Sequence, residues 1–257
     1  METATSADGT PIAWSASGDG PLVVIVNGAI SRAVDAADLA SALESAGFRV
    51  ATWDRRARGS SGDARGSTPQ NEAEDLAAVI EAAGGDAIVL GHSSGAVLAL
   101  FAASMGVPVR ALFLSEPPLR FGEDEPPADL AERLQQLVDD GRSDEAIVTF
   151  QREAVGLPDD MIEQIRASEQ FAGMVPLGQS TVYDQNLTRL VSTPTPQMLA
   201  VEVPVTVLRG EQTFPMLMTA ADRLADEMDA ELVVVPESVM HRADPAATAR
   251  VVKERAG

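Results

Sequence analysis

The feature that most constrains the fold is a five-residue turn, Gly91-His92-Ser93-Ser94-Gly95, set between two apolar segments. An uninterrupted apolar run precedes it at residues 87–90, and an Ala- and Leu-rich stretch follows it at 96–104. The run predicts a strand that is covered on both faces, and the stretch predicts a helix. A strand, a tight turn of small residues and a helix form the setting in which a serine is exposed at the end of a parallel sheet.

The spacing of the turn fits nucleophilic chemistry at Ser93. Glycines flank the serine because the backbone of such a turn excludes most side chains. A helix that starts at Ser94 directs free backbone N–H groups, and the positive end of its dipole, at developing negative charge. We therefore predict Ser93 as a nucleophile, against the alternative of a glycine-rich turn with an incidental serine.

Composition excludes several classes of protein. The chain has 257 residues, which suits one domain or one domain with an inserted lid. Its net charge of −20 argues against nucleic acid and anionic membrane surfaces as partners. Cysteine is absent, which excludes disulfides and thiolate metal sites.

The same features set our expectations for location and partners. The N-terminus lacks a basic segment followed by an apolar one, and no apolar run approaches the length of a membrane span. We expect a soluble cytoplasmic protein that binds a small-molecule substrate, with no nucleic-acid or membrane partner, no metal and no cofactor. A homodimer is compatible with the sequence, which does not define the oligomeric state.

Strand and helix patterns alternate along most of the chain. Strands are expected at 12–15, 22–26, 48–53, 87–90, 109–114, 203–208 and 231–235. Helices are expected at 34–46, from Asn71 onward, at 94–104, at 215–228 and at 245–255. Short repeated strand–helix units imply right-handed crossovers and a parallel sheet. Residues 117–201 have helical periodicity only, which predicts an α/β core of 1–116 and 202–257 with an all-helical insert.

Two motifs resemble those of the α/β-hydrolase superfamily, and the resemblance extends over nearly the whole chain. One is the turn around Ser93. The other is the segment 53–61, Trp-Asp-Arg-Arg-Ala-Arg-Gly-Ser-Ser, which resembles the loop (Tyr/Trp)-Asp-x-Arg-Gly-x-Gly-x-Ser after the family's fourth strand. The resemblance is close to small bacterial members with Gly-His-Ser-Ser-Gly and a Glu-Pro-Pro segment after the sixth strand. It implies a mostly parallel central sheet flanked by helices, with a helical cap over the substrate.

The resemblance also implies partners for Ser93. His241 follows the last strand, where the family's general base belongs, whereas His92 lies inside the turn and is expected to pack beneath it. Two carboxylates compete to orient the imidazole. Glu116 follows the sixth strand, as in fungal-type zearalenone lactonases, and Glu211 follows the seventh strand, the commoner position. We favour Glu116, because the family's acid normally lies further past the glycine than Glu211 does.

The oxyanion hole and the pocket follow from the same resemblance. One N–H is expected from Ser94 and another from the loop of Gly28 and Ala29, where Asn27 replaces the usual histidine. Asn27 and several large side chains are candidates for substrate contact, although helical core is an equally good reading of the latter: Phe121, Phe150, Phe171, Met174 and Tyr183. Other residues have simpler interpretations. We expect Trp53 in the core, Asp54 anchoring its loop, Arg55, Arg56 and Arg58 in surface ion pairs, and Asp124 and Glu125 in solvent.

These expectations favour a serine hydrolase, similar to carboxylesterases and lactonases, that cleaves an ester, lactone or related acyl bond of a small to medium apolar substrate. Thioesterase and carbon–carbon hydrolase activities remain open. The alternative is a non-hydrolytic enzyme, such as a cyclase or lyase, or a ligand-binding protein on the same scaffold.

Overall fold

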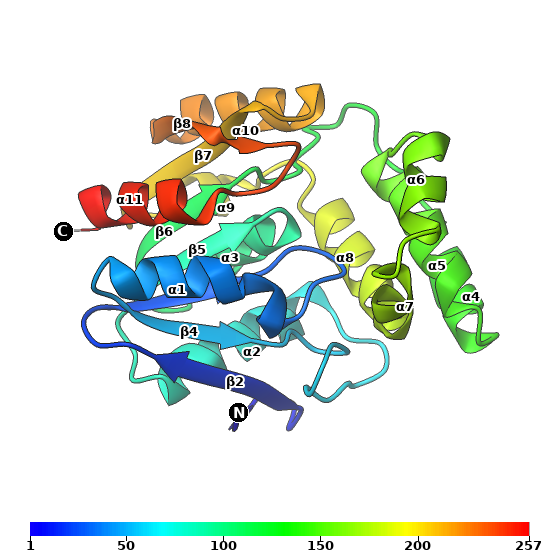
Figure 1. The fold of residues 1–257 in the computed structure, drawn as a ribbon, viewed down its shortest axis with the longest axis horizontal. Coiled ribbons are helices and arrows are strands. Elements are labelled where there is room, and N and C mark those ends of the chain that lie inside the picture. The colour runs from blue at the N-terminus through cyan, green and yellow to red at the C-terminus, as the bar shows by residue number, and fades with distance from the viewer. Residues whose placement is uncertain (257) are drawn as a thin grey trace.

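Eight strands form one sheet, in which β3 to β8 run parallel and β2, at one edge, pairs antiparallel with both β4 and β1 (Figure 1). This computed structural model describes residues 1–256. The strand order is β1-β2-β4-β3-β5-β6-β7-β8. The strands are β1 (Glu2–Thr5), β2 (Pro11–Ser17), β3 (Leu22–Val26), β4 (Arg49–Trp53), β5 (Ala87–His92), β6 (Val109–Ser115), β7 (Val205–Gln212) and β8 (Glu231–Val239).

Helices cover both faces of the sheet, which explains why the central strands are continuously apolar. On one face, α1 (Ala37–Ser45) and α11 (Pro245–Arg255) pack against β3, β5 and β6. On the other lie α2 (Pro69–Ala82), α3 (Ser94–Ser104) and α10 (Pro215–Met228). Every residue of β3 is buried. The predicted fold class, a mostly parallel sheet flanked by helices, is confirmed.

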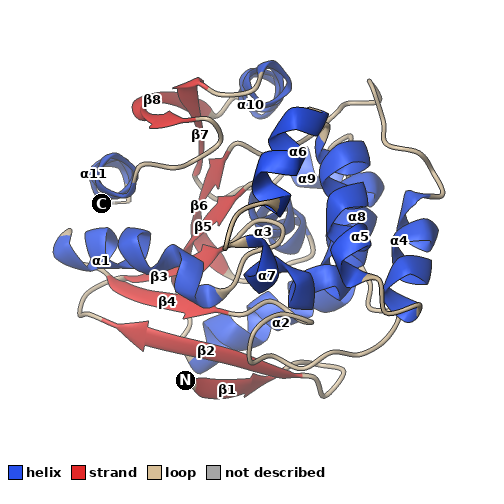
Figure 2. Cartoon of the chain, turned by 45° about the vertical axis from the view of Figure 1, so that its right-hand side comes forward, coloured by secondary structure: helices blue, strands red, loops and turns tan. Residues whose placement is uncertain are grey.

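In the part of the chain that the structure describes, the segment between β6 and β7 contains helices and no strand. We call this segment the helical insert; it lies beside the sheet in Figures 1 and 2. It comprises α4 (Leu130–Asp139), α5 (Ser143–Phe150), a π-helical turn (Gln151–Val155), α6 (Asp159–Arg166), α7 (Phe171–Met174), a 3-10 turn (Val175–Leu177), α8 (Gly178–Leu190) and α9 (Pro196–Leu199). Its own apolar cluster, formed by α4, α5 and α8, packs against Ala29 and Ile30 of the loop after β3.

Several element boundaries differ from the sequence-based expectation. β1 was not predicted, because its four residues carry no apolar run and pair antiparallel with β2 at the sheet edge. The second helix begins at Pro69, capped by Thr68, and Asn71 occupies the third position of a capping box. A 3-10 turn at Ala33–Ala36 precedes α1, and β8 continues to Val239. None of the helices described has the length and apolarity needed to cross a membrane.

Candidate active site

Ser93 occupies the sharp turn between β5 and α3 with a strained backbone, at φ 56° and ψ −129°. A non-glycine residue at positive φ in such a turn is typical of a functional position. The flanking glycines permit close packing. A Cβ added at Gly91 would lie 2.5 Å from the Cα of Ala96, and one at Gly95 would lie 2.1 Å from the carbonyl oxygen of Val26. Only glycine fits either position without moving the backbone.

The structure brings Glu116 and His241 together. Oε2 of Glu116 lies 2.5 Å from Nδ1 of His241 and accepts a further hydrogen bond from the Thr213 hydroxyl at 3.0 Å. Its Oε1 accepts from the Gly210 N–H at 2.8 Å. Burial raises the pKa of Glu116, but the hydrogen bonds from His241, Gly210 and Thr213 outweigh burial, and the net shift is downward. Glu211, the competing carboxylate, is exposed near the end of β7.

His92 supports this pair from below. Its Nε2 lies 3.2 Å from the carbonyl oxygen of His241, and its Nδ1 lies 3.1 Å from Oγ of Ser115. Because a carbonyl oxygen only accepts, Nε2 of His92 carries the proton, and in the neutral ring Nδ1 accepts from the Ser115 hydroxyl. Burial, and the nearby charge of His241, lower the pKa of His92 to about 4.

The loop after β3 approaches Ser93 closely. A Cβ added at Gly28 would lie 2.8 Å from Cβ of Ser93 and 3.4 Å from its Oγ. Ala29 and Ser94 line the same cavity as Ser93. The backbone N–H groups of Ala29 and Ser94 donate to no acceptor in residues 1–256, so both are free to bind an oxyanion. Asn27 turns aside, and its side-chain amide donates to the carbonyl oxygen of Arg32 at 2.8 Å.

Ser93 and His241 line one cavity of about 270 Å³. Residues that follow β3, β5, β6, β7 and β8 form its floor, as expected where the carboxyl ends of parallel strands meet. The helical insert and the start of α10 form its walls. The lining is mainly apolar and includes Pro118, Pro126, Phe150, Ala154, Val155, Leu157, Phe214, Met216 and Leu217. Besides Ser93, Ser94 and His241, its polar members are Arg120, Glu125 and Thr188.

Of the five pocket aromatic and methionine candidates, Phe150 lines this cavity, whereas Phe121, Phe171, Met174 and Tyr183 are not part of its lining. Tyr183 is buried, and its hydroxyl donates to Asp63 at 2.8 Å. Phe121 stacks beneath Arg223, with the guanidinium carbon 4.1 Å from the ring centroid. Met174 faces a separate surface hollow, and Phe171 is absent from the cavity lining.

Phe214, Met216 and Leu217 were missed by sequence reasoning. They could have been predicted from their position shortly after β7, at the edge of the sheet where the site lies.

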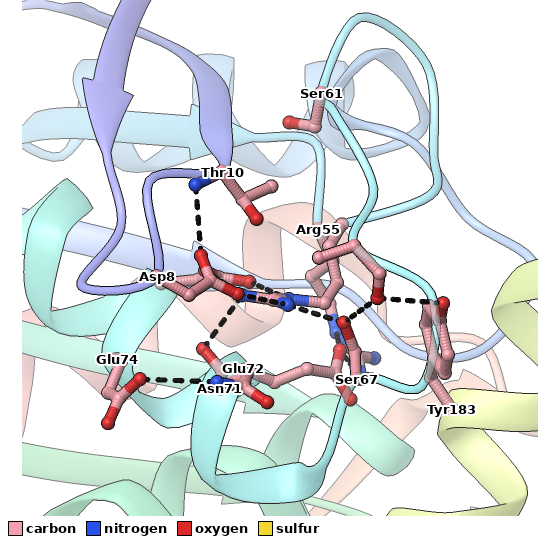
Figure 3. A network of polar contacts seen from close by, with 12 residues as sticks. Asp8, Thr10, Arg55, Ser61, Ser67, Asn71, Glu72, Glu74 and Tyr183 are labelled. Atoms are coloured by element: carbon pink, nitrogen blue, oxygen red, sulfur yellow. Dashed lines mark hydrogen bonds and ion pairs between the residues drawn. The ribbon is translucent and has the colours of Figure 1, made fainter.

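The three arginines after β4 correct another expectation, because all three are buried and most of their ion-pair partners are buried too. Arg55 pairs with Glu72 of α2 and Asp184 of α8, and Arg58 pairs with Asp184. Arg56 makes a bidentate pair with Asp75 and also contacts Asp8 and Ser67. Figure 3 shows part of this network around Arg55, Ser67 and Tyr183.

Asp54 anchors its loop as expected, by accepting from the N–H groups of Ala33 and Ser60. Trp53 is in the core. Glu125 lies in the cavity wall, where it accepts a hydrogen bond from Ser192. In the described part of the chain, no three His, Cys, Asp or Glu side chains gather as a metal site would require.

Comparison with known proteins places this chain in one family. The sequence matches the model of the alpha/beta hydrolase family over residues 23–252, so the chain belongs to the α/β-hydrolase family. An alpha/beta hydrolase from Sphaerobacter thermophilus DSM 20745 is 38% identical, with a TM-score of 0.91 and coverage of 98% of this chain and 99% of that one. A search of the curated proteins found none that matches the sequence.

More distant solved structures share the fold. The enol-lactonase from Burkholderia xenovorans LB400 is 18% identical, with a TM-score of 0.74 and 98% of each chain covered. A thermophilic esterase from Thermogutta terrifontis is 21% identical, with a TM-score of 0.72 and coverage of 98% of this chain and 95% of that one.

Proposed function

We propose that this chain is a serine hydrolase that cleaves an acyl bond through a covalent intermediate on Ser93. The observation that carries the proposal is the hydrogen bond of 2.5 Å between Glu116 and His241, beside a cavity that both His241 and the strained Ser93 line. A buried carboxylate, an imidazole and a serine at the start of a helix are the parts that acyl transfer requires.

In the proposed mechanism, Oγ of Ser93 attacks the substrate carbonyl and Nε2 of His241 takes its proton. Glu116 holds the proton of the imidazole on Nδ1 and stabilises the imidazolium as it forms. The N–H groups of Ser94 and Ala29 bind the oxyanion of the tetrahedral intermediate. His241 then protonates the leaving alcohol, which departs and leaves an acyl-enzyme. Water gives a proton to His241 as it attacks the acyl carbon, and His241 then returns this proton to Oγ of Ser93 as the bond to Ser93 breaks and the acid leaves.

The cavity supports a neutral, largely apolar acyl group of small to medium size. Its volume of about 270 Å³ is slightly below the usual range of ligand pockets, and carbon atoms dominate its lining. We propose residues 117–201 as a cap over this site, since residues from the π-helical turn and α8 form part of its wall. The esterase and the enol-lactonase that share the fold support ester or lactone hydrolysis of this kind.

A fluorophosphonate probe tests the proposal directly, because it phosphonylates only an activated serine. We expect one equivalent of mass gain on Ser93, found by peptide mapping, and no labelling of folded Ser93→Ala. Turnover of p-nitrophenyl esters from acetate to octanoate should disappear in the same variant. Folded protein that neither labels nor turns over any ester would favour the cyclase, lyase or binding-protein alternative.

A further inference from the structure

The buried arginines after β4 connect the helical insert with both segments that supply oxyanion N–H groups. Arg55 and Arg58 are each 1% exposed, and Asp184 of α8 is fully buried between them. Oδ2 of Asp184 accepts from Nη2 of Arg58 at 2.8 Å, and its Oδ1 accepts from Nη1 of Arg55 at 3.0 Å. The same Oδ1 accepts from the hydroxyl of Ser94 at 2.8 Å. One carboxylate of the insert is therefore bonded to all three groups.

Each of the two arginines also donates to the loop after β3. Nη1 of Arg58 donates to the carbonyl oxygen of Gly28 at 2.6 Å, and Nη1 of Arg55 donates to that of Asn27 at 3.2 Å. The peptide units are planar and trans, so the C=O of one residue and the N–H of the next point in opposite directions. Arg58, by holding the Gly28 carbonyl, fixes the direction of the Ala29 N–H. Arg55 does the same for the Gly28 N–H.

Charge adds to this geometry. A guanidinium bonded to a carbonyl oxygen polarises the peptide and makes its N–H a stronger donor. Burial raises the pKa of Asp184, but the charges of Arg58 and Arg55 outweigh burial and lower it, so the carboxylate is ionised at neutral pH. The arginines thus keep their counterion, and the fixed charges lie behind the N–H groups rather than in the cavity.

We propose that Arg58 and Asp184 are positioning residues that aim the Ala29 N–H into the oxyanion hole, and that the helical insert completes this hole through Asp184. The inference rests on the proposed function, because it requires an oxyanion at Ser93. A salt bridge that served only to fasten the insert would stabilise the fold without affecting transition-state binding.

Arg58→Lys tests the proposal, since lysine keeps the charge but loses the forked donors. With p-nitrophenyl butyrate, we expect kcat to fall by about ten- to one-hundredfold while KM stays within about twofold. An alkyl trifluoromethyl ketone forms a tetrahedral adduct with an active serine, so its Ki should rise by the factor by which kcat/KM falls. Unchanged kcat and Ki, or a change in KM alone, would overturn the proposal.

Arg56→Lys is the matched control. Arg56 is equally buried and also paired with an aspartate, but it contacts neither the Asn27–Gly28 loop nor Ser94. Arg56→Lys should lower the melting temperature, while its kcat and Ki should stay within about twofold of the wild-type values.

If Arg58→Lys does not fold, Ser94→Ala answers the question, because it removes one hydrogen bond of Asp184 and keeps the Ser94 N–H. A severalfold loss in kcat with a matching rise in Ki supports the inference, and unchanged values overturn it. Fluorophosphonate labelling of the wild-type protein distinguishes a failure of this inference from a failure of the proposed function. If the wild-type protein is labelled but the variants have wild-type kcat and Ki, this inference fails and the proposed function stands. If the wild-type protein is not labelled, both the inference and the proposed function fail.

Discussion

The imidazole of His92 lies against that of His241, with ring centroids 4.7 Å apart and Nε2 of His92 within hydrogen-bond distance of the His241 carbonyl oxygen. His241 has a positive φ of 61°, so this bond to its backbone helps to hold a strained conformation. His92 therefore supports the backbone of the proposed base, His241, and also packs beneath the turn that carries Ser93.

This relationship makes the stability of the protein dependent on pH. The pKa of His92 is lowered to about 4 in the folded chain, from an ordinary value of 6.5. As the pH falls from about 6.5 to about 4, the unfolded chain binds a proton at His92 that the folded chain does not, so stability is lost over this window. The loss amounts to at most about 3 kcal/mol.

His92→Gln should remove this part of the pH dependence, because glutamine can keep the donor to the His241 carbonyl but does not titrate. Urea denaturation at several pH values gives the free energy of unfolding for both proteins. We expect wild type to lose more stability than the variant between pH 6.5 and 4, and the two to run parallel above pH 7. Parallel curves throughout would contradict the assignment of a buried neutral His92.

Glu116→Gln should lower kcat by about a thousandfold or more, because the amide no longer stabilises the imidazolium of His241. Steady-state hydrolysis of p-nitrophenyl butyrate measures the effect. Glu211→Gln is the matched control and should retain kcat within about twofold, since Glu211 is exposed. The reverse result would place the acid of the proposed triad after β7.

The choice between these two glutamates shows which features can be predicted from sequence periodicity and which cannot. Periodicity predicted the parallel sheet, the strand–turn–helix around Ser93 and the helical segment, because each is a local pattern. The partner of His241 depends on how the loops after β6 and β8 meet, and 125 residues of chain separate the two side chains.

Tertiary packing also explains the errors. Arg55 and Arg58 look like surface residues in an acidic chain, yet they are neutralised inside the protein by Glu72 of the next helix and by Asp184, which lies 129 residues from Arg55 in the sequence. The face that Tyr183 presents could not be read from the sequence either, because helical spacing does not reveal whether a side chain meets a cavity or the neighbouring loop at Asp63.

Gly28→Ala should abolish or strongly reduce reaction at Ser93 while the fold is kept. The added methyl group would lie 2.8 Å from Cβ of Ser93, and the backbone of Gly28 is not at positive φ, so crowding alone is responsible. The rate of fluorophosphonate labelling measures the effect. Gly173→Ala is the control, since nothing lies within 4 Å of its added Cβ, and it should label at the wild-type rate. Equal rates for both variants would show that the loop after β3 yields to the methyl group.

Leu157→Trp should shorten the acyl chains that the protein accepts, because Leu157 lines the cavity of about 270 Å³ and the indole would fill part of it. Each methylene that a hydrophobic pocket loses or gains is worth roughly 1–3 kcal/mol in discrimination, so the ratio of kcat/KM for octanoate over acetate should fall by at least about tenfold. p-Nitrophenyl esters of graded length supply the measurement. Leu190→Trp is the matched control: Leu190 is 61% exposed and lies outside this cavity, so its ratio should equal that of wild type. If Leu157→Trp also keeps the wild-type ratio, the acyl chain binds elsewhere and the cavity instead holds the leaving group.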